Sequence, residues 1–318
     1  MTEPESLRIG ISSCLLGQQV RFDGGHKRDA FLVDTFGPFV EWVPVCPEVE
    51  LGLGTPRETL RLVRKDDAVR MVQPKSGRDI TDAMREFARA RVKALADERL
   101  AGYVLKKDSP SCGMERVRIY AESGMAEKGG RGLFAEALID RFPHLPVEEE
   151  GRLSDPRLRE NFVERVFAYA RLRAFFETRW TVGQLVRFHT AHKLTLLAHS
   201  PEIYYAMGRL VAGGASMSRA ELEAQYRDRF MVALARMATA RKHANVLTHM
   251  LGHFKQLLEA DDRAELLASI EDYRLGLIPL VVPLTLFKHH VRRHHVEYLA
   301  GQVYLDPHPR ELMLRNHV

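Results

Sequence analysis

Three cysteines are the residues of this 318-residue chain whose type and spacing most directly suggest chemistry. Cys14, Cys46 and Cys112 lie 32 and 66 residues apart. In a reducing compartment an odd number of thiols excludes a disulfide framework, so no disulfide partner is expected. Three roles are left for the thiols: ligands of a metal or cluster, packing in the core, or a single reactive nucleophile.

Each cysteine follows a short apolar segment typical of a buried strand. These segments are residues 8–13, 40–45 and 102–107. Because the carboxyl ends of parallel strands meet at one edge of a sheet, we expect the three thiols to lie close together there. The spacing favours a shared thiolate site, with core packing and a lone nucleophile as the alternatives.

Three thiolates suit an iron–sulfur cluster better than zinc, because thiolate is the usual ligand of such clusters. A 4Fe-4S cluster that four cysteines hold is closed and suited to electron transfer. A cluster that three cysteines hold keeps one iron with an open position, and this iron acts as a Lewis acid.

The elements that would position these thiols alternate between strands and helices over residues 1–150. An amphipathic helix is predicted over 79–100, and a second one over 133–140, after the glycine run at 129–132. We therefore predict an α/β Rossmann-like N-terminal domain with a parallel sheet. A stretch rich in proline and glutamate at 142–155 predicts a last strand and a domain boundary.

Residues 151–318 show helical periodicity and few strand signals, so we predict an all-α C-terminal domain. The expected helices are 157–177, 182–197, 219–237, 241–260, 266–275 and 285–299. This half holds 24 Lys and Arg against 17 Asp and Glu, and 12 of the 14 histidines, whereas residues 1–150 hold 23 against 25. The excess of positive charge favours either a strongly negative partner or an ordinary solvated helical surface.

The composition, with 45% hydrophobic and 28% charged residues, is typical of a globular protein and argues against disorder or a coiled coil. The longest strongly apolar stretch, 275–287, has 13 residues, whereas a bilayer-spanning helix needs about 20. The N-terminus carries two glutamates before its first apolar run, unlike a signal peptide. We expect a cytoplasmic protein without a membrane partner.

The sequences around the cysteines resemble the thiouracil desulfidase (TudS) family over roughly residues 7–150. The matching segments are CLLG at 14–17, VRFDG at 20–24, CPE at 46–48 and KKDSPSCG at 106–113. The second half resembles the YbgA-like domain through FHTAHKLTLLAHSP, NVLTHMLGHFK and IPLVVPLTLFKHH, which begin at residues 188, 245 and 278. The fusion of the two is similar to desulfidases that act on 4-thiouridine in tRNA.

The resemblance implies that Cys14, Cys46 and Cys112 hold a 4Fe-4S cluster whose open iron binds the thiocarbonyl sulfur of the substrate. Glu48 would activate water for attack on the carbon that carries the sulfur. The product would be uridine, and no electron would be consumed. Alternatively, Glu48 caps the next helix or pairs with Arg57 or Arg21.

Further residues of these motifs are expected in the site. One of Ser109 and Ser111 would donate a hydrogen bond or relay a proton, with Ser111 favoured because it precedes Cys112; alternatively both bond their own backbone in a turn. Substrate contacts are predicted at Arg21, Asp23, Lys106 and Gly130. Gly130 belongs to the glycine run, whose backbone N–H groups would face a phosphate or a base.

Basic residues at helical spacing in the second half suit contacts with phosphate. The predicted RNA contacts are Lys193, which shares a face with His189 and His192, together with Lys242, Lys288, Arg292 and Arg293. We therefore predict a tRNA 4-thiouridine desulfidase. Two alternatives stay open: the same chemistry on free thiouracil or a thionucleoside, and a non-catalytic RNA-binding or iron–sulfur sensor protein. The sequence does not indicate an oligomeric state.

Overall fold

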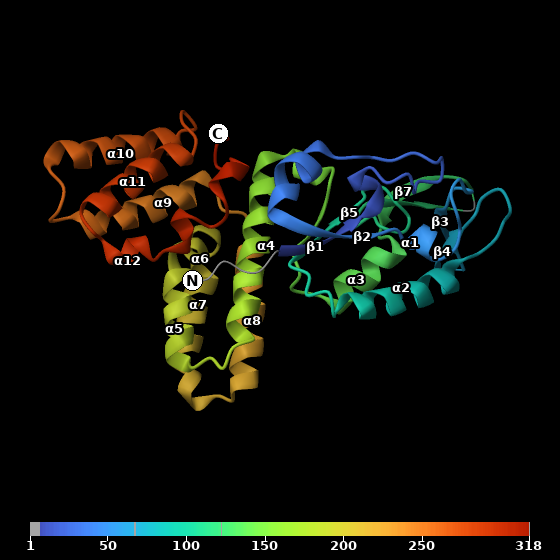
Figure 1. The fold of residues 1–318 in the computed structure, drawn as a ribbon, viewed down its shortest axis with the longest axis horizontal. Coiled ribbons are helices and arrows are strands. Elements are labelled where there is room, and N and C mark those ends of the chain that lie inside the picture. Colours follow the sequence, from blue (N-terminus) through green and yellow to red (C-terminus); the bar gives the residue numbers. More distant parts are fainter. Residues whose placement is uncertain (1–6, 67, 122, 318) are drawn as a thin grey trace. The chain divides into compact units, whose positions relative to one another are not determined.

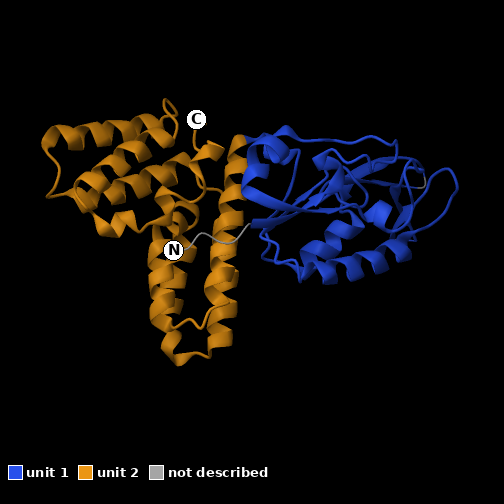
Figure 2. Cartoon of the chain, viewed as in Figure 1, with its two compact units in different colours: residues 1–155 blue, residues 156–318 orange. Residues whose placement is uncertain are grey.

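The computed structural model describes residues 7–66, 68–121 and 123–317. The chain divides into two compact units, Met1–Asp155 and Pro156–Val318 (Figure 2). No helix in the described ranges is both long and apolar enough to cross a membrane.

The first unit is built on a sheet of four parallel strands, in the order β2-β1-β5-β8 (Figure 1). The strands are β1 (Leu7–Ser12), β2 (Val40–Val45), β5 (Gly102–Leu105) and β8 (Val147–Glu149). All residues of β5 and nearly all of β1 are buried, as expected for parallel strands covered on both faces. The predicted parallel α/β architecture is confirmed, while the Rossmann-like assignment stays a prediction.

The order of the strands reverses direction between β1 and β5. From β1 the chain passes to β2 on one side of the sheet, and β5 and β8 are then added on the other side. Crevices that bind ligands in open α/β sheets lie at such a reversal, beyond the carboxyl ends of the strands. The predicted third strand stops at Leu105, so Lys106 and Lys107 already belong to the loop above this crevice.

The sequence did not predict a second sheet, of order β4-β3-β6-β7, in the first unit. Its strands are β3 (Arg61–Lys65), β4 (Ala68–Val72), β6 (Val117–Tyr120) and β7 (Ala126–Gly130), which form two antiparallel hairpins joined by the parallel pair β3 and β6. Only one face is buried, through residues such as Leu62, Met71 and Ile119. Short, charged, half-buried strands give a weak apolar pattern, and this is why the sequence did not indicate the second sheet.

Two helices pack side by side on this unit (Figure 1). They are α2 (Thr81–Leu95) and α3 (Leu133–Arg141), close to the predicted ranges. Helix α2 starts later than predicted because Asp79 Oδ1 accepts the N–H of Thr81, 2.8 Å away. It also ends five residues early, where the chain turns toward β5 with Arg99 at a positive φ of 52°.

The described part of the second unit is helical, which confirms the all-α prediction. Its helices are α4 (Pro156–Phe176), α5 (Val182–Ala191), α6 (Lys193–His199), α7 (Pro201–Ala212), α8 (Arg219–Ala235), α9 (Ala240–Leu251), α10 (Ala260–Arg274), α11 (Val281–Arg293) and α12 (Glu297–Ala300). They surround two apolar cores, one centred on Tyr226 and Phe230 and the other on Phe254 and Phe287.

Several predicted helix boundaries in this unit were wrong. The range 182–197 is two helices that meet at His192, and 285–299 is α11 followed by α12. The range 241–260 ends as an α-helix at Leu251, and α7 was not predicted. Ser200 is the N-cap of α7, and its side chain accepts the N–H of Ile203, while Pro201 occupies the first turn.

The loop between β5 and β6 is anchored on the first turn of α3. The carbonyl oxygens of Pro110 and Ser111 accept the N–H groups of Leu133 and Phe134 at 3.1 and 3.0 Å. These N–H groups have no partner within the helix, so the loop serves as its cap. Gly132 permits the approach, because a Cβ there would lie 2.4 Å from the carbonyl oxygen of Ser111.

We expect Gly132→Ala to lower the free energy of unfolding of the first unit by about 1–3 kcal/mol, because the added methyl group pushes on backbone that has little room to move. The matched control is Gly129→Ala, where a Cβ meets nothing within 4 Å. Urea denaturation in a Trp180→Phe background measures the effect, since Trp42 then reports on the first unit alone. Equal stability of the two variants would contradict this packing.

Candidate functional site

All three cysteines line one cavity of about 340 Å³ in the first unit, at the carboxyl ends of β1, β2 and β5. Cys14 and Cys112 are buried, and Cys46 is partly exposed. The cavity wall also includes Glu48, Arg57 and Ser109. The three thiols were expected to meet at one sheet edge, and the structure brings them to it.

Cys14 is held by a short 3₁₀ helix, η1 (Ser13–Leu16), that continues directly from β1. Its carbonyl oxygen accepts the N–H of Lys27 at 2.9 Å and that of Gly17 at 3.3 Å. Gly17 has a φ of 92°, a conformation that a residue without a side chain adopts at no steric cost. This turn fixes the thiol at the end of the strand.

Cys46 is the N-cap residue of the short helix α1 (Pro47–Glu50). Pro47 occupies the first helical position, where no N–H group is needed, and Glu50 Oε1 accepts the N–H of Cys46 at 3.0 Å. The sharp turn from strand to helix puts Glu48, two residues after the thiol, on the wall of the same cavity.

Cys112 is held from two sides. Its N–H donates to Ser109 Oγ at 3.1 Å, and its thiol interacts with the side chain of Ser12. The Oγ of Ser12 also accepts the N–H of Lys106 at 3.0 Å, so this serine links the end of β1 to the loop after β5. Burial raises the pKa of Cys14 to about 11 and that of Cys112 well above its ordinary value.

The chemistry of this donor set suits a cluster. Within residues 7–66, 68–121 and 123–317, no three His, Cys, Asp or Glu side chains gather as ligands of one metal ion. The cysteines of a cluster bind different iron atoms, so their sulfur atoms need not converge on one point. Three thiols around one cavity therefore fit an iron–sulfur cluster better than a single ion.

Glu48 is engaged on both of its oxygens. Its Oε2 accepts from Arg57 Nη2 at 2.6 Å and from Nε at 2.9 Å, and its Oε1 accepts the hydroxyl of Ser111 at 2.9 Å. The Arg57 side chain is 4% exposed and that of Glu48 is 15% exposed. The structure thus contains the ion pair with Arg57 that was considered as an alternative role for Glu48.

Arg57 makes contacts beyond the predicted pairing with Glu48. Besides Glu48, its Nη1 donates to the carbonyl oxygens of Val20 and Gly54, each at 2.9 Å. Arg57 therefore ties the loop of Val20, helix α1 and its own segment together at the cavity wall. Its sequence neighbourhood carries no motif, and the only signal was that a buried carboxylate needs a cation.

The two serines have different positions. Ser109 lines the cavity, and its Oγ accepts the N–H groups of Ser111 and Cys112, so it forms the turn that was considered as an alternative. Ser111 is fully buried and donates to Glu48 instead. The structure thus joins Ser111 to the carboxylate and Ser109 to the backbone of the third cysteine.

Of the four predicted substrate contacts, two line the cavity and two lie outside it. Arg21 and Lys106 line it, and Lys106 Nζ lies 2.5 Å from Glu150 Oε1. Asp23 lies outside its wall, and a hydrogen bond from the N–H of Gly25 helps to lower the pKa of the Asp23 carboxyl. Gly130 ends β7 opposite Val117 and is not part of the cavity.

The predicted RNA contacts in the second unit are also in different environments. Arg292 and Arg293 are exposed at the end of α11, and Lys288 pairs with Asp306 at 2.5 Å. Lys193 lies over the ring of Tyr298. Lys242 Nζ donates to the carbonyl oxygens of His199 and Met237, so this side chain stabilises the fold.

His189 and His192, expected beside Lys193, are buried in the core. Burial lowers the pKa of His189 to about 4 and that of His192 to about 3. Both imidazoles are therefore neutral at pH 7, and they do not add to the positive surface.

Two family models match the chain. Residues 9–150 match "2-thiouracil desulfurase", and residues 193–309 match "Protein of unknown function (DUF1722)". YbgA of Escherichia coli (strain K12) is 35% identical over 161 residues, which cover 50% of this chain and 95% of YbgA. YbbK of Bacillus subtilis (strain 168) is 34% identical over 114 residues, or 33% of this chain and 72% of YbbK.

Among solved structures, the [4Fe-4S]-dependent thiouracil desulfidase TudS is similar to this chain at 32% identity and a TM-score of 0.37. The match covers 47% of this chain and 95% of that protein.

We expect Arg57→Ala to lower the free energy of unfolding of the first unit by about 3 kcal/mol, because it leaves a largely buried carboxylate without its cation. The matched control is Arg64→Ala, whose pair with Glu127 has a similar length, 2.5 Å, but side chains that are 46% and 63% exposed. That loss should be about 0–1 kcal/mol. Urea denaturation in the Trp180→Phe background compares them, and equal losses would show that burial does not matter here.

Proposed function

This chain belongs to the 2-thiouracil desulfurase family through its first unit and to the family of YbgA through its second, and it is an enzyme that breaks a carbon–sulfur bond; we propose that its substrate is 4-thiouridine in tRNA. In the proposed reaction, water replaces sulfur on the base, and uridine and hydrogen sulfide are released. The atoms balance without an oxidant or a reductant, so no electron is consumed.

We propose that Cys14, Cys46 and Cys112 hold a 4Fe-4S cluster. The support is that the three thiols, donors that iron–sulfur clusters prefer, line one cavity beside a carboxylate. Such a cluster with three ligands supplies an iron with an open position, a Lewis acid suited to a soft thiocarbonyl sulfur.

The observation that carries the proposal is the position of Glu48 on the same cavity wall as the three thiols. In the proposed mechanism, the carboxylate takes a proton from water as that water attacks the carbon bearing sulfur. Arg57 holds Oε2 in place, while Ser111 orients Oε1. Lys106 and Arg21 contribute positive charge to the wall.

The basic second unit supports a tRNA substrate. Arg292 and Arg293 are exposed on α11, and Lys193 shares a surface with His253 and Tyr298, whose rings stack 4.6 Å apart. Cations beside a partly exposed aromatic pair suit the phosphates and bases of RNA. A 4-thiouridine in folded tRNA must also be turned outward to reach a cavity, and a second domain that grips the RNA helps to do this.

A second candidate function is desulfuration of free 2-thiouracil, with the helical unit in another role. The name of the family model that matches residues 9–150 favours it. The two functions share the cavity and Glu48 but differ in whether the second unit contributes to substrate binding.

We expect Glu48→Gln to reduce kcat about 10²- to 10⁴-fold, because the amide takes up no proton from water. Iron and sulfide content after anaerobic reconstitution should stay unchanged, since the change leaves the thiols in place. The control is Glu127→Gln, at an exposed carboxylate on β7. Full activity of Glu48→Gln would remove the general base from the mechanism, and a protein that carries a cluster but never turns over would point to a sensor.

We expect the reconstituted wild-type protein to remove the thiocarbonyl absorbance of tRNA containing 4-thiouridine faster than that of free 2-thiouracil. Affinity for tRNA should fall steeply with salt, and Arg292→Ala with Arg293→Ala should reduce the slope of log K against log salt by about one per residue. The charge-matched control is Arg64→Ala with Lys65→Ala, at two exposed positions at the end of β3. Turnover of the free base alone would refute the tRNA substrate and support the second candidate.

A further inference from the structure

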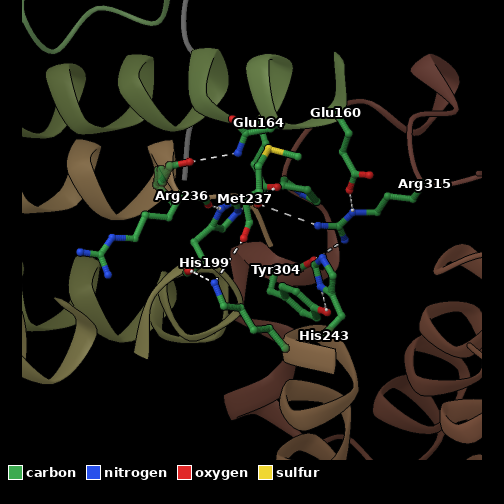
Figure 3. A network of polar contacts seen from close by, with 12 residues as sticks. Glu160, Glu164, His199, Arg236, Met237, His243, Tyr304 and Arg315 are labelled. Atoms are coloured by element: carbon green, nitrogen blue, oxygen red, sulfur yellow. Dashed lines mark hydrogen bonds and ion pairs between the residues drawn. The ribbon is translucent and has the colours of Figure 1, made fainter. Parts of the chain in front are cut away.

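The second unit contains its own cavity, of about 440 Å³, far from the thiols in sequence. Figure 3 shows the polar residues that surround it: Glu160 and Glu164 on α4, His199 at the end of α6, His243 on α9, and Arg315 in the C-terminal segment. Neither the conversion of a thiobase nor the proposed binding of phosphates uses these residues.

Glu164 is a buried carboxylate with poor partners. Its side chain is 4% exposed, and its contacts are His199 Nε2 at 3.4 Å and Arg315 Nη2 at 3.9 Å. Both distances exceed those of ordinary hydrogen bonds to oxygen. Burial alone would raise the pKa of Glu164, but His199 and Arg315 outweigh it and lower this pKa, so the carboxylate is ionised.

Arg315 has a spare donor at the same place. Its Nη1 donates to the carbonyl oxygen of Tyr304 at 2.7 Å and its Nε to Glu160 at 3.2 Å. Its Nη2 is buried and has no hydrogen-bond partner in the described chain. Figure 3 shows the guanidinium pointing from the C-terminal segment toward Glu164 and the middle of the network.

The charges of the network indicate what kind of ligand the cavity accepts. Arg157, Arg274 and Arg315 carry positive charge on this wall. Glu160 and Glu164 carry negative charge on the same wall. A phosphate would be repelled by the carboxylates and a metal ion by the arginines, so a neutral ligand that both donates and accepts hydrogen bonds fits best.

That ligand should offer a donor and an acceptor side by side, because an under-bonded carboxylate and a free guanidinium N–H lie next to each other. The same wall also carries apolar and aromatic side chains such as Met237, Tyr273 and Leu280, beside further polar side chains such as Asn161 and Thr239. A flat ring with an N–H beside a C=O, between apolar surfaces, meets both requirements.

We propose that this cavity binds an unpaired nucleobase that carries adjacent N–H and C=O groups, as uracil and guanine do. Glu164 accepts the ring N–H, and Arg315 Nη2 donates to the neighbouring carbonyl oxygen. In RNA, such a site would hold a base of the substrate outside the catalytic cavity, and this part of the inference rests on the proposed function.

The test measures binding of uridine, guanosine and 3-methyluridine to the full-length protein by equilibrium dialysis. Uridine and guanosine should bind, and 3-methyluridine, in which a methyl group replaces the ring N–H, should bind at least tenfold more weakly. Glu164→Gln should weaken uridine binding at least tenfold. Ala238→Leu, which narrows the cavity without touching the polar groups, should do the same.

The matched control for charge is Glu223→Gln, a carboxylate of this unit that pairs with Arg227 on the surface of α8. It should bind uridine like the wild type, and thermal unfolding checks that each variant is folded. Equal binding of 3-methyluridine, no binding of any nucleoside, or uridine binding that neither Glu164→Gln nor Ala238→Leu changes would each overturn the proposal.

A single-stranded oligouridylate distinguishes the source of the base. Tighter binding than uridine, lost in Glu164→Gln, supports a base carried by RNA, whereas equal binding supports a free nucleoside or base as the ligand. The proposed function fails separately, because turnover of free 2-thiouracil depends on the first unit alone. If the wild-type protein binds uridine at this cavity but converts no thiobase, the proposed desulfidase function is refuted, while the proposed nucleobase site is still supported.

Discussion

The candidate site depends on one constraint, the parallel pairing of β1 with β2 on one side and β5 on the other. Parallel strands end at the same edge, so the pairing brings together Cys14, Cys46 and the loop of Cys112 from distant parts of the chain. Ser12, the last residue of β1, reinforces the arrangement because it bonds the backbone of Lys106 and contacts the thiol of Cys112. A shift in this pairing would separate the thiols, whatever their individual surroundings.

The second requirement is a carboxylate that is held in a fixed position near those thiols. Taking Glu48 out of water is unfavourable, and Arg57 offsets this with two hydrogen bonds to one oxygen. Arg57 also binds two backbone carbonyl groups, so the cation that supports the carboxylate is part of the wall that shapes the cavity. Ser111 completes the set and is itself fixed where its carbonyl oxygen caps α3. The position of Glu48 thus depends on the same contacts that shape the cavity wall.

These features differ in how well the sequence predicts them. The first sheet and the sheet edge of Cys14, Cys46 and Cys112 follow from continuous apolar runs, which strands buried on both faces require. The second sheet was missed because one side of it is charged and exposed. The contact between Glu48 and Arg57 joins segments separated by a loop, so the sequence supplied candidates but no choice among them. The break at His192 and the role of Lys242 depend on side chains that bond to carbonyl groups, which periodicity does not reveal.

The histidines show how composition misleads about the second unit. Because the second unit is rich in histidine, we expected these side chains to add to a positive surface that contacts RNA. Burial lowers the pKa of His189, His192 and His243 to between about 3 and 4, so these side chains are neutral at pH 7. These three histidines therefore add no positive charge to the surface, whereas the interior keeps an ionic network around Glu164 and Arg315. Buried charges are weak evidence for stability, because apolar residues of the same volume often do as well. A network that also leaves a donor of Arg315 without a partner is better explained by a ligand than by folding.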